Sequence, residues 1–330
     1  MISEDDWEKL EKIIRKNHKF IITTHINPDG DGLGSELGIC RLLEKLGKDC
    51  VIINDSPTPE FYKFLDPDGK LIKHYEEKYR QCILESNVIF LMDISNMERL
   101  GGMDEIVKSS RATKVCIDHH HSNIGWSDLN IVDELASASG EIVFDLINRM
   151  GFEIDEKIAL SLYVAILTDT GSFRFSNTTP RVHFICAELL KKGIKPREIF
   201  GYIYESYSWE RMILFSKSLT TLKKIAGGKA AAIQVSKEMM MSSGAKREDI
   251  EGFVEYITTV KDVEIAALFL ELPGNKIKVS LRSKGKYDVN RIAGIFGGGG
   301  HKNASGILMK DYTLQKAENE VLSEIERVIK

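Results

Sequence analysis

The sequence has few cysteines, and no two of them have the spacing of a metal-binding or redox CxxC motif. The five cysteines are scattered and mostly stand in apolar stretches, which favours reduced thiols in a protein core. No apolar run approaches the roughly 18 to 20 residues of a membrane span, and the acidic first residues lack a signal-peptide pattern. We therefore expect a cytoplasmic protein without a membrane partner.

A large excess of basic charge is also absent. The formal net charge is −4, with 45 Lys and Arg against 49 Asp and Glu. From residue 216 onward there are 19 basic and 14 acidic residues, so the acidic excess lies in the earlier part. An acidic part suits bound cations and a basic part suits an anionic substrate, although unrelated solvated surfaces also differ in this way. The surplus is too small for a long nucleic-acid footprint.

The length of 330 residues predicts about two domains, and 43% hydrophobic with 28% charged residues is typical of a globular protein. We expect a first domain over residues 1–190, a helical linker over 191–215 and a second domain over 216–330.

Apolar runs that alternate with helical patterns predict an α/β first domain whose mainly parallel sheet is flanked by helices. Its strands are expected at 20–23, 50–53, 87–93 and 114–118, and its main helices at 5–16, 35–46, 137–150, 155–168 and 181–192. The second domain is expected to be a smaller α/β unit. Its strands are expected at 229–235, 263–269, 276–283 and 307–309, and its helices at 253–259, 289–296 and 314–329.

The stretch from Thr24 to Ser35 holds the densest set of chemistry-bearing residues. It places His25, Asp29 and Asp31 on a Gly-rich turn between an apolar strand and a helix. In an open α/β sheet this crevice is where ligands bind. Carboxylates gathered there need a neutralising partner, and a divalent cation supplies it. An EF-hand is excluded because Cys40 stands at its twelfth position; an ordinary Asp-Gly turn is the bland alternative.

Two later strands also end in polar side chains. Asp93 closes one apolar run, and Asp118-His119-His120-His121 closes the next. Because parallel strands place their carboxyl ends on one edge of a sheet, these residues and His25 are expected to meet there. Taken alone, Asp93 also fits a helix N-cap, and the histidine run also fits a surface turn.

Asp169 follows the helical pattern 155–168, which is apolar on most sides and therefore predicted to be buried. A carboxylate at a helix carboxyl end is disfavoured by the helix dipole, so a cation is expected nearby. A capped turn, with Gly171 two residues later, is the alternative.

Four consecutive glycines begin the segment 297–306, GGGGHKNASG. They lack the GxGxxG spacing of a dinucleotide site, and they stand within a domain and not between domains, where a flexible linker belongs. Glycine amides allow close backbone approach to a phosphate or sugar.

These residues resemble a known family. The set of His25, Asp29, Asp31, Asp93, Asp118-His119-His120 and Asp169 resembles the DHH phosphoesterase superfamily, and residues 297–306 resemble the DHH-associated second domain. Together they look like the nanoRNase/pAp phosphatase and cyclic-di-AMP phosphodiesterase group. The resemblance covers nearly the full chain in the right order, without a gap at any metal position.

The resemblance implies two Mn²⁺ ions in a cleft between the two domains, with Mg²⁺ or another divalent cation as the alternative. Mixed imidazole and carboxylate ligands agree with Mn²⁺. One ion would be held by His25, Asp29 and Asp93. The other would be held by Asp31, Asp93, His119 and Asp169, with Asp93 bridging.

The resemblance also implies catalytic and substrate-binding roles. His120 would face the substrate phosphate, Asp118 would orient a ligand histidine, and Asp93 would join the ions. Substrate would be bound by Arg282, Ser283, Gly298, Gly299 and His301. For Arg282, an exposed strand residue beside Lys284 and Lys286 is the alternative.

The implied reaction breaks phosphorus from O3′ in short RNA, pApA and pAp, and by the same bond in cyclic-di-AMP. The sequence does not rank these substrates. An inorganic pyrophosphatase and a non-catalytic nucleotide sensor are the alternatives to a nuclease, and a homodimer is implied by resemblance alone.

Overall fold

In the computed structural model, which describes residues 2–120, 123 and 125–330, the chain divides into two units, Met1–Ser206 and Tyr207–Lys330. His121 of the histidine run lies outside the described residues. The expected linker 191–215 contains α8 (Pro196–Tyr204), which belongs to the first unit, and the start of α9 (Trp209–Leu219), which belongs to the second. No helix of the described residues combines the length and apolar character needed to cross a membrane.

A six-stranded parallel sheet lies at the centre of the first unit, with strand order β3-β2-β1-β4-β5-β6. Its central strands are buried on both faces, which explains their continuous apolar sequences. The strands are β1 (Lys19–Thr24), β2 (Asp49–Asn54), β3 (Ile72–His74), β4 (Val88–Met92), β5 (Thr113–Asp118) and β6 (Leu129–Val132). The short β3 and β6 were not expected from the sequence.

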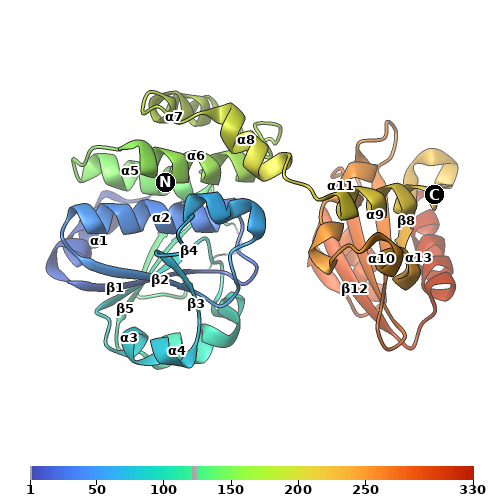
Figure 1. The fold of residues 1–330 in the computed structure, drawn as a ribbon, viewed down its shortest axis with the longest axis horizontal. Coiled ribbons are helices and arrows are strands. Elements are labelled where there is room, and N and C mark those ends of the chain that lie inside the picture. The colour runs from blue at the N-terminus through green and yellow to red at the C-terminus, as the bar shows by residue number, and fades with distance from the viewer. Residues whose placement is uncertain (1, 121–122, 124) are drawn as a thin grey trace. The chain divides into compact units, whose positions relative to one another are not determined.

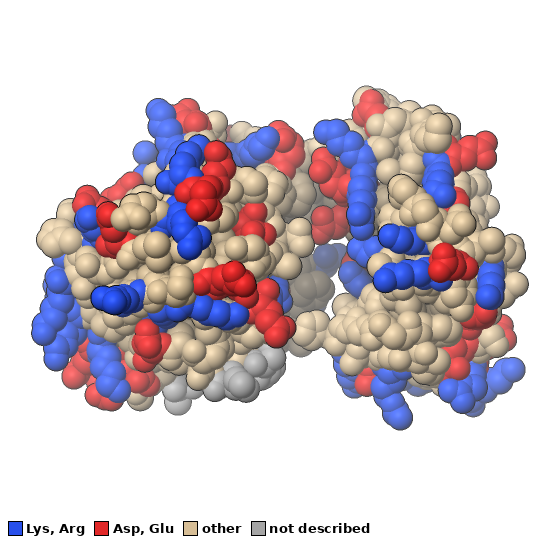
Figure 2. Space-filling view, turned by 90° about the horizontal axis from the view of Figure 1, so that it is seen from below, with Lys and Arg blue, Asp and Glu red and all other residues tan. Residues whose placement is uncertain are grey.

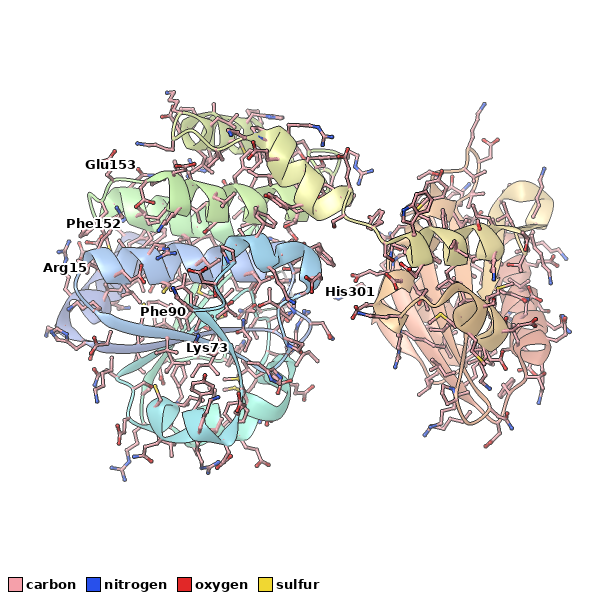
Figure 3. The ribbon with its side chains drawn as sticks, in the orientation of Figure 1. Arg15, Lys73, Phe90, Phe152, Glu153 and His301 are labelled. Carbon is pink, nitrogen blue, oxygen red and sulfur yellow. The ribbon has the colours of Figure 1, made fainter. Side chains whose placement is uncertain are left out.

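Helices cover both faces of this sheet (Figure 1). One face packs against α1 (Glu4–Lys16), α2 (Gly30–Lys45), α5 (Ser139–Arg149) and α6 (Glu156–Asp169), with α7 (Pro180–Leu190) outside them. The other packs against α3 (Arg80–Leu84) and α4 (Asp104–Ser109). Successive residues of β4 point to opposite faces of the sheet. Phe90, labelled in Figure 3, packs in the core beneath α1, α2, α5 and α6, and Leu91 packs in the core beneath α3 and α4. Short 3₁₀ helices lie at Glu60–Leu65, Glu77–Tyr79 and Met97–Met103.

The second unit has its own six-stranded sheet, with strand order β11-β12-β10-β9-β8-β7. Among the described strands of this second sheet, only β8 and β9 pair in parallel, and the other pairs are antiparallel. The strands are β7 (Lys223–Ile225), β8 (Ala230–Val235), β9 (Ile265–Leu272), β10 (Lys276–Ser283), β11 (Gly299–His301) and β12 (Ala304–Lys310). Helices α9, α10 (Lys237–Ser243) and α11 (Phe253–Thr258) cover one face, and α12 (Val289–Ile295) and α13 (Leu314–Ile329) the other.

These observations confirm the predicted α/β class, with a mainly parallel first sheet and a smaller second unit. The surface agrees with the weak charge asymmetry. On the face drawn in Figure 2, basic and acidic side chains are interspersed on each unit.

The glycine run contains a strand that was not expected from the sequence. Residues Gly299 to His301 form β11, which pairs with β12 through a tight connection. A Cβ atom on Gly298 would overlap the carbonyl oxygen of Gly306, so this close strand approach requires glycine.

Candidate metal centre

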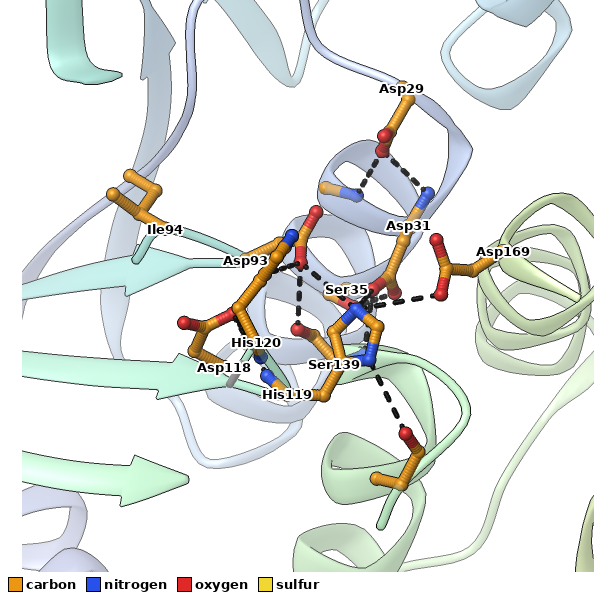
Figure 4. Close-up of polar contacts among 12 residues, drawn as sticks. Asp29, Asp31, Ser35, Asp93, Ile94, Asp118, His119, His120, Ser139 and Asp169 are labelled. Carbon is orange, nitrogen blue, oxygen red and sulfur yellow. Dashed lines mark hydrogen bonds and ion pairs between the residues drawn. The ribbon is translucent and has the colours of Figure 1, made fainter. Parts of the chain in front are cut away.

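Three neighbouring strands deliver side chains to one edge of the first sheet. His25 follows β1, Asp93 follows β4, and Asp118 ends β5 with His119 and His120 directly after it. Since β4 pairs with both β1 and β5, Asp93 stands between the other two strand ends. The structure therefore brings together residues that are far apart in the sequence, as Figure 4 shows for Asp93, Asp118, His119 and His120.

The amino end of α2 supplies two more carboxylates. The helix begins at Gly30, five residues before the expected start, because Asp29 caps it by accepting hydrogen bonds from the amides of Asp31 and Gly32. Asp31 is consequently in the first helical turn and not on a loop, which corrects the sequence-based placement. A Cβ atom on Gly32 would overlap the Thr24 side chain, so glycine lets the helix approach the strand end.

The first group of donor atoms lies around His25. Its Nδ1 donates a hydrogen bond to the carbonyl oxygen of Ile26 at 2.8 Å. The other ring nitrogen, Nε2, is therefore the atom available to bind a metal ion. Nε2 lies 3.5 Å from Asp93 Oδ2 and 3.7 Å from Asp29 Oδ2. These three side chains form one candidate metal-binding group.

The second group lies around His119. Its Nδ1 donates to the carbonyl oxygen of Ala136 at 3.3 Å, so Nε2 again faces the carboxylates. Nε2 lies 3.5 Å from Asp93 Oδ1, 3.6 Å from Asp31 Oδ2 and 3.5 Å from Asp169 Oδ2. Asp169 is the last residue of α6 and faces this ring in Figure 4. Asp31, His119 and Asp169 form a second candidate group.

The separations of 3.5 to 3.7 Å are too long for good hydrogen bonds. They are close to the separation expected between two ligand atoms that bind the same cation, each at about 2.1 Å from it. Both imidazoles also have Nδ1 engaged by a backbone carbonyl, the usual support of a metal-binding histidine. The residues present therefore fit a divalent cation in each group.

The electrostatics of the cluster agree with this fit. Burial, reinforced by Asp93 and Asp169, raises the pKa of Asp31 well above its usual value. Burial also raises the pKa of Asp169 to about 6, with Asp93 contributing. For His25 burial opposes the charged form, but Asp29 and Asp93 raise its pKa to about 10. Without a cation the His25 imidazole therefore keeps its second proton at neutral pH, and a bound cation would displace that proton.

His120 is held by a neighbouring carboxylate. Its Nδ1 donates to Asp118 Oδ1 at 2.7 Å, which leaves Nε2 available. Asp118 is fully buried and also accepts hydrogen bonds from the amide of His119 and from Asn123 Nδ2. Burial opposes the charged ring, but the bond to Asp118 raises the pKa of His120. Asp118 thus orients His120, whereas the resemblance implied that it orients a metal-ligand histidine.

The proposed substrate-binding residues all lie in the second unit. Arg282 and Ser283 end β10, and Arg282 Nε donates to Glu255 Oε1 at 2.7 Å. Gly299 and His301 are exposed on the edge strand β11, and His301 projects from its unit in Figure 3. Gly298 is enclosed by strand β12, so its packing already accounts for the missing side chain.

Sequence reasoning missed several residues that support the donors. The amides of Ser139 and Gly140, at the amino end of α5, donate to the Asp31 carboxylate at 2.7 and 2.9 Å. Ser139 Oγ also donates to Asp93 Oδ1 at 3.2 Å. Small residues at the start of a predicted helix were the only available signal, since a helix amino end favours anions.

A second supporting contact lies behind His25. Glu36 on α2 is fully buried, and its Oε2 accepts from Asn54 Nδ2 at 2.9 Å. Asn54 Oδ1 in turn accepts from the amide of Thr24, the residue before His25, at 3.1 Å. Burial raises the pKa of Glu36 to about 8. A single Glu in an apolar helical pattern gave no sign of this role.

The fold and the site define a class: two-unit α/β proteins with adjoining imidazole–carboxylate groups at the carboxyl edge of a parallel sheet. Comparison with known proteins makes the class specific. The model of the DHH family N-terminal domain matches residues 19–166, and that of the DHHA1 domain matches residues 227–330. The chain belongs to the DHH family, in agreement with the resemblance found in its motifs.

Relatives match the chain over nearly their whole length. The chain is 33% identical to the bifunctional oligoribonuclease and PAP phosphatase NrnA of Thermus thermophilus, with 97% of this chain and 94% of that protein covered. It is 25% identical to the protein of that name from Bacillus subtilis, with 94% of each covered. Among solved structures, an exopolyphosphatase-related protein from Bacteroides fragilis matches with a TM-score of 0.94 and 31% identity, covering 100% and 98% of the chains.

Proposed function

We propose that the chain is a metal-dependent phosphoesterase that hydrolyses the P–O3′ bond of short nucleotides. It converts short oligoribonucleotides and pApA to 5′-monophosphates, and pAp to AMP. The observation that carries this proposal is the Asp93 carboxylate, whose two oxygens face the imidazoles of separate donor groups. The names of the Thermus thermophilus and Bacillus subtilis relatives, oligoribonuclease and PAP phosphatase, support it.

Two divalent cations, Mn²⁺ by resemblance with Mg²⁺ or another ion as the alternative, are the proposed cofactors. His25, Asp29 and Asp93 would hold one, and Asp31, Asp93, His119 and Asp169 the other. When bound, such a pair supplies Lewis acidity for phosphoryl oxygens and lowers the pKa of water. Mixed nitrogen and oxygen donors suit Mn²⁺ better than an all-oxygen cage does.

The side chains themselves divide the remaining work. Asp118 fixes the His120 ring through Nδ1, so Nε2 is positioned to donate a hydrogen bond to a phosphoryl oxygen. Burial opposes the charged ring, but the bond to Asp118 raises the pKa of His120 and so favours the charged form, which would offset negative charge on that oxygen. Ser139 supports Asp93 from behind through Oγ.

The second unit is proposed to bind the other part of the substrate. Arg282 and His301 would contact a terminal phosphate or base, with Ser283 and the amides of Gly298 and Gly299 assisting. Glu255 already pairs with Arg282, so the guanidinium is held in place before substrate binds. A small basic surplus suits short anions and gives long chains no added binding.

A length series tests the proposal. With Mn²⁺, 5′-phosphorylated RNAs of increasing length should yield 5′-monophosphates, and the rate should not rise beyond about five nucleotides, the span of a single binding groove. Rates that keep rising with length would reject the short-substrate assignment. Phosphate release from pyrophosphate alone would indicate a pyrophosphatase, and binding without turnover a sensor. The rate of cyclic-di-AMP hydrolysis, measured in parallel, shows how this substrate ranks against short RNA, pApA and pAp.

Two further properties belong to the same proposal. We place the protein in the cytoplasm, a location supported by five cysteines that are all free thiols. We also propose a homodimer, which light scattering of the purified chain tests directly.

A further inference from the structure

The turn after α6 has an unusual backbone. Gly171, Ser172 and Phe173 are three consecutive residues with positive φ, at 56°, 59° and 64°. Residues other than glycine rarely adopt this conformation, so surrounding contacts must hold it. Phe173 provides one anchor, since its ring packs against Tyr163 and His183 at centroid distances of 6.3 and 5.4 Å.

Hydrogen bonds fix the rest of this turn to the candidate metal centre. Asn177 Nδ2 donates to the carbonyl oxygen of Asp169 at 3.1 Å and to that of Ser137 at 3.0 Å. Asp169 belongs to the second candidate metal-binding group, and Ser137 belongs to the segment that leads into Ser139. The turn is therefore tied to the backbone of Asp169 and to that of the segment before Ser139.

This anchored turn presents an exposed aromatic ring. Phe175 is 56% exposed, and its ring lies against Gly171, where a Cβ atom would overlap it. Glycine thus satisfies both the positive φ and the space that the ring needs. Arg174 is exposed beside it, with Nε donating to the carbonyl oxygen of Gly171 at 2.6 Å. Its guanidinium carbon lies 6.0 Å from the Phe175 ring centre.

We propose that Phe175 is the platform on which a nucleobase of the substrate stacks, an inference that rests on the proposed function. A nucleobase is one sugar away from its phosphate, and the ring is packed on Gly171, two residues beyond the donor Asp169. Arg174 adds positive charge where the substrate is anionic. A phenyl ring offers a π-face and no hydrogen-bonding group, so it accepts any base.

A comparison of enzyme variants on substrates with and without each base tests this proposal. The Mn²⁺-loaded wild type and Phe175→Ala are compared on pApA and on two analogues in which either adenosine lacks its base. We expect Phe175→Ala to raise KM for pApA about tenfold, the effect of losing one stacked base. On the analogue that lacks the stacked base, the substitution should change KM less than twofold. Phe175→Trp should restore pApA binding, and pGpG should behave like pApA.

Phe184→Ala is the matched control, because Phe184 on α7 is similarly exposed, at 59%, and should leave KM unchanged. An equal effect of Phe175→Ala on all three substrates, or no effect on any, would overturn the stacking role. Binding of AMP and ribose 5-phosphate, measured by calorimetry, separates the two proposals. If the wild type hydrolyses none of the substrates, the proposed function fails, whereas a Phe175-dependent preference for AMP still supports the platform.

Discussion

Asp93 Oδ1 lies 3.5 Å from His119 Nε2, across the boundary between two strands. The other oxygen of the same carboxylate lies equally far from His25 Nε2. Asp93 has a positive φ of 57°, so the chain leaves β4 abruptly and places the carboxylate between its neighbours. One side chain thereby joins both candidate metal groups.

Replacing Asp93 should therefore disable both groups at once. We expect Asp93→Asn to lower the rate of pApA hydrolysis at least a thousandfold and to reduce bound Mn²⁺ below one ion per chain, because the shared charge is lost. Metal analysis after gel filtration measures the second effect. Asp128→Asn is the control, since Asp128 accepts from the amide of Lys114 at the start of β5. Full retention of metal by the Asp93 variant would disprove the shared role.

Metal binding should release protons. The pKa of His25 in the metal-free protein is about 10, so its imidazole is charged at pH 7 and must lose a proton to become a ligand. We expect at least one proton released per chain, and an affinity that rises as pH increases toward that pKa. Calorimetric titration with Mn²⁺ in buffers of different protonation enthalpy measures this number. His25→Gln should lower it by one, and heats independent of buffer would contradict the account.

His120 should affect turnover more than metal content. We expect His120→Ala to lower kcat by about 10² to 10³, in the range of lost proton-transfer or charge stabilisation, while both ions remain. Asp118→Asn should have a smaller effect on kcat and should move the alkaline fall of activity to lower pH, because the carboxylate that raises the pKa of His120 is gone. Loss of metal in His120→Ala would instead make this residue a ligand, as its proximity to Asp93 and His119 allows.

The core of the site could be predicted because its strands are buried on both faces. Such strands are continuous apolar runs, and β1, β4 and β5 each end where polar residues begin. The start of α2 was placed too late because three glycines there hide the helical pattern, although Asp29 was a recognisable N-cap. Ser139 could not be singled out, since its role depends on where α5 packs.

Glu36 was overlooked for a similar reason, since its burial depends on how α2 packs. That burial should make the free energy of unfolding depend on pH. The folded-state pKa is about 8 against an ordinary value of 4.5, so the folded protein holds an extra proton between these values. The resulting stability is fully present below the unfolded pKa and is lost as pH rises through about 8. Glu36→Gln cannot ionise and should gain stability relative to wild type at pH 9, by roughly 1 kcal/mol or more.

Urea denaturation of the metal-free proteins at pH 6 and pH 9 measures this difference. Glu44→Gln, on the exposed part of the same helix, should show the wild-type pH dependence. A Glu36→Gln variant with that same dependence would show that Glu36 ionises normally in the folded protein.

Most strands of the second unit were predicted, but the strand within its glycine run was not. Alternating residues of β10 gave a clear strand signal, since Ile277, Val279 and Leu281 face the core. Glycine has low intrinsic strand preference, so no strand was predicted at β11. It forms because β12 provides a partner strand, a tertiary contact that sequence alone does not reveal.

The most direct test of the account is diffraction from Mn²⁺-soaked crystals, with anomalous data collected near the manganese edge. We expect two peaks about 3.5 to 4 Å apart, on either side of the Asp93 carboxylate, one bound by His25 and the other by His119. A single peak, or peaks that Asp93 does not contact, would contradict it.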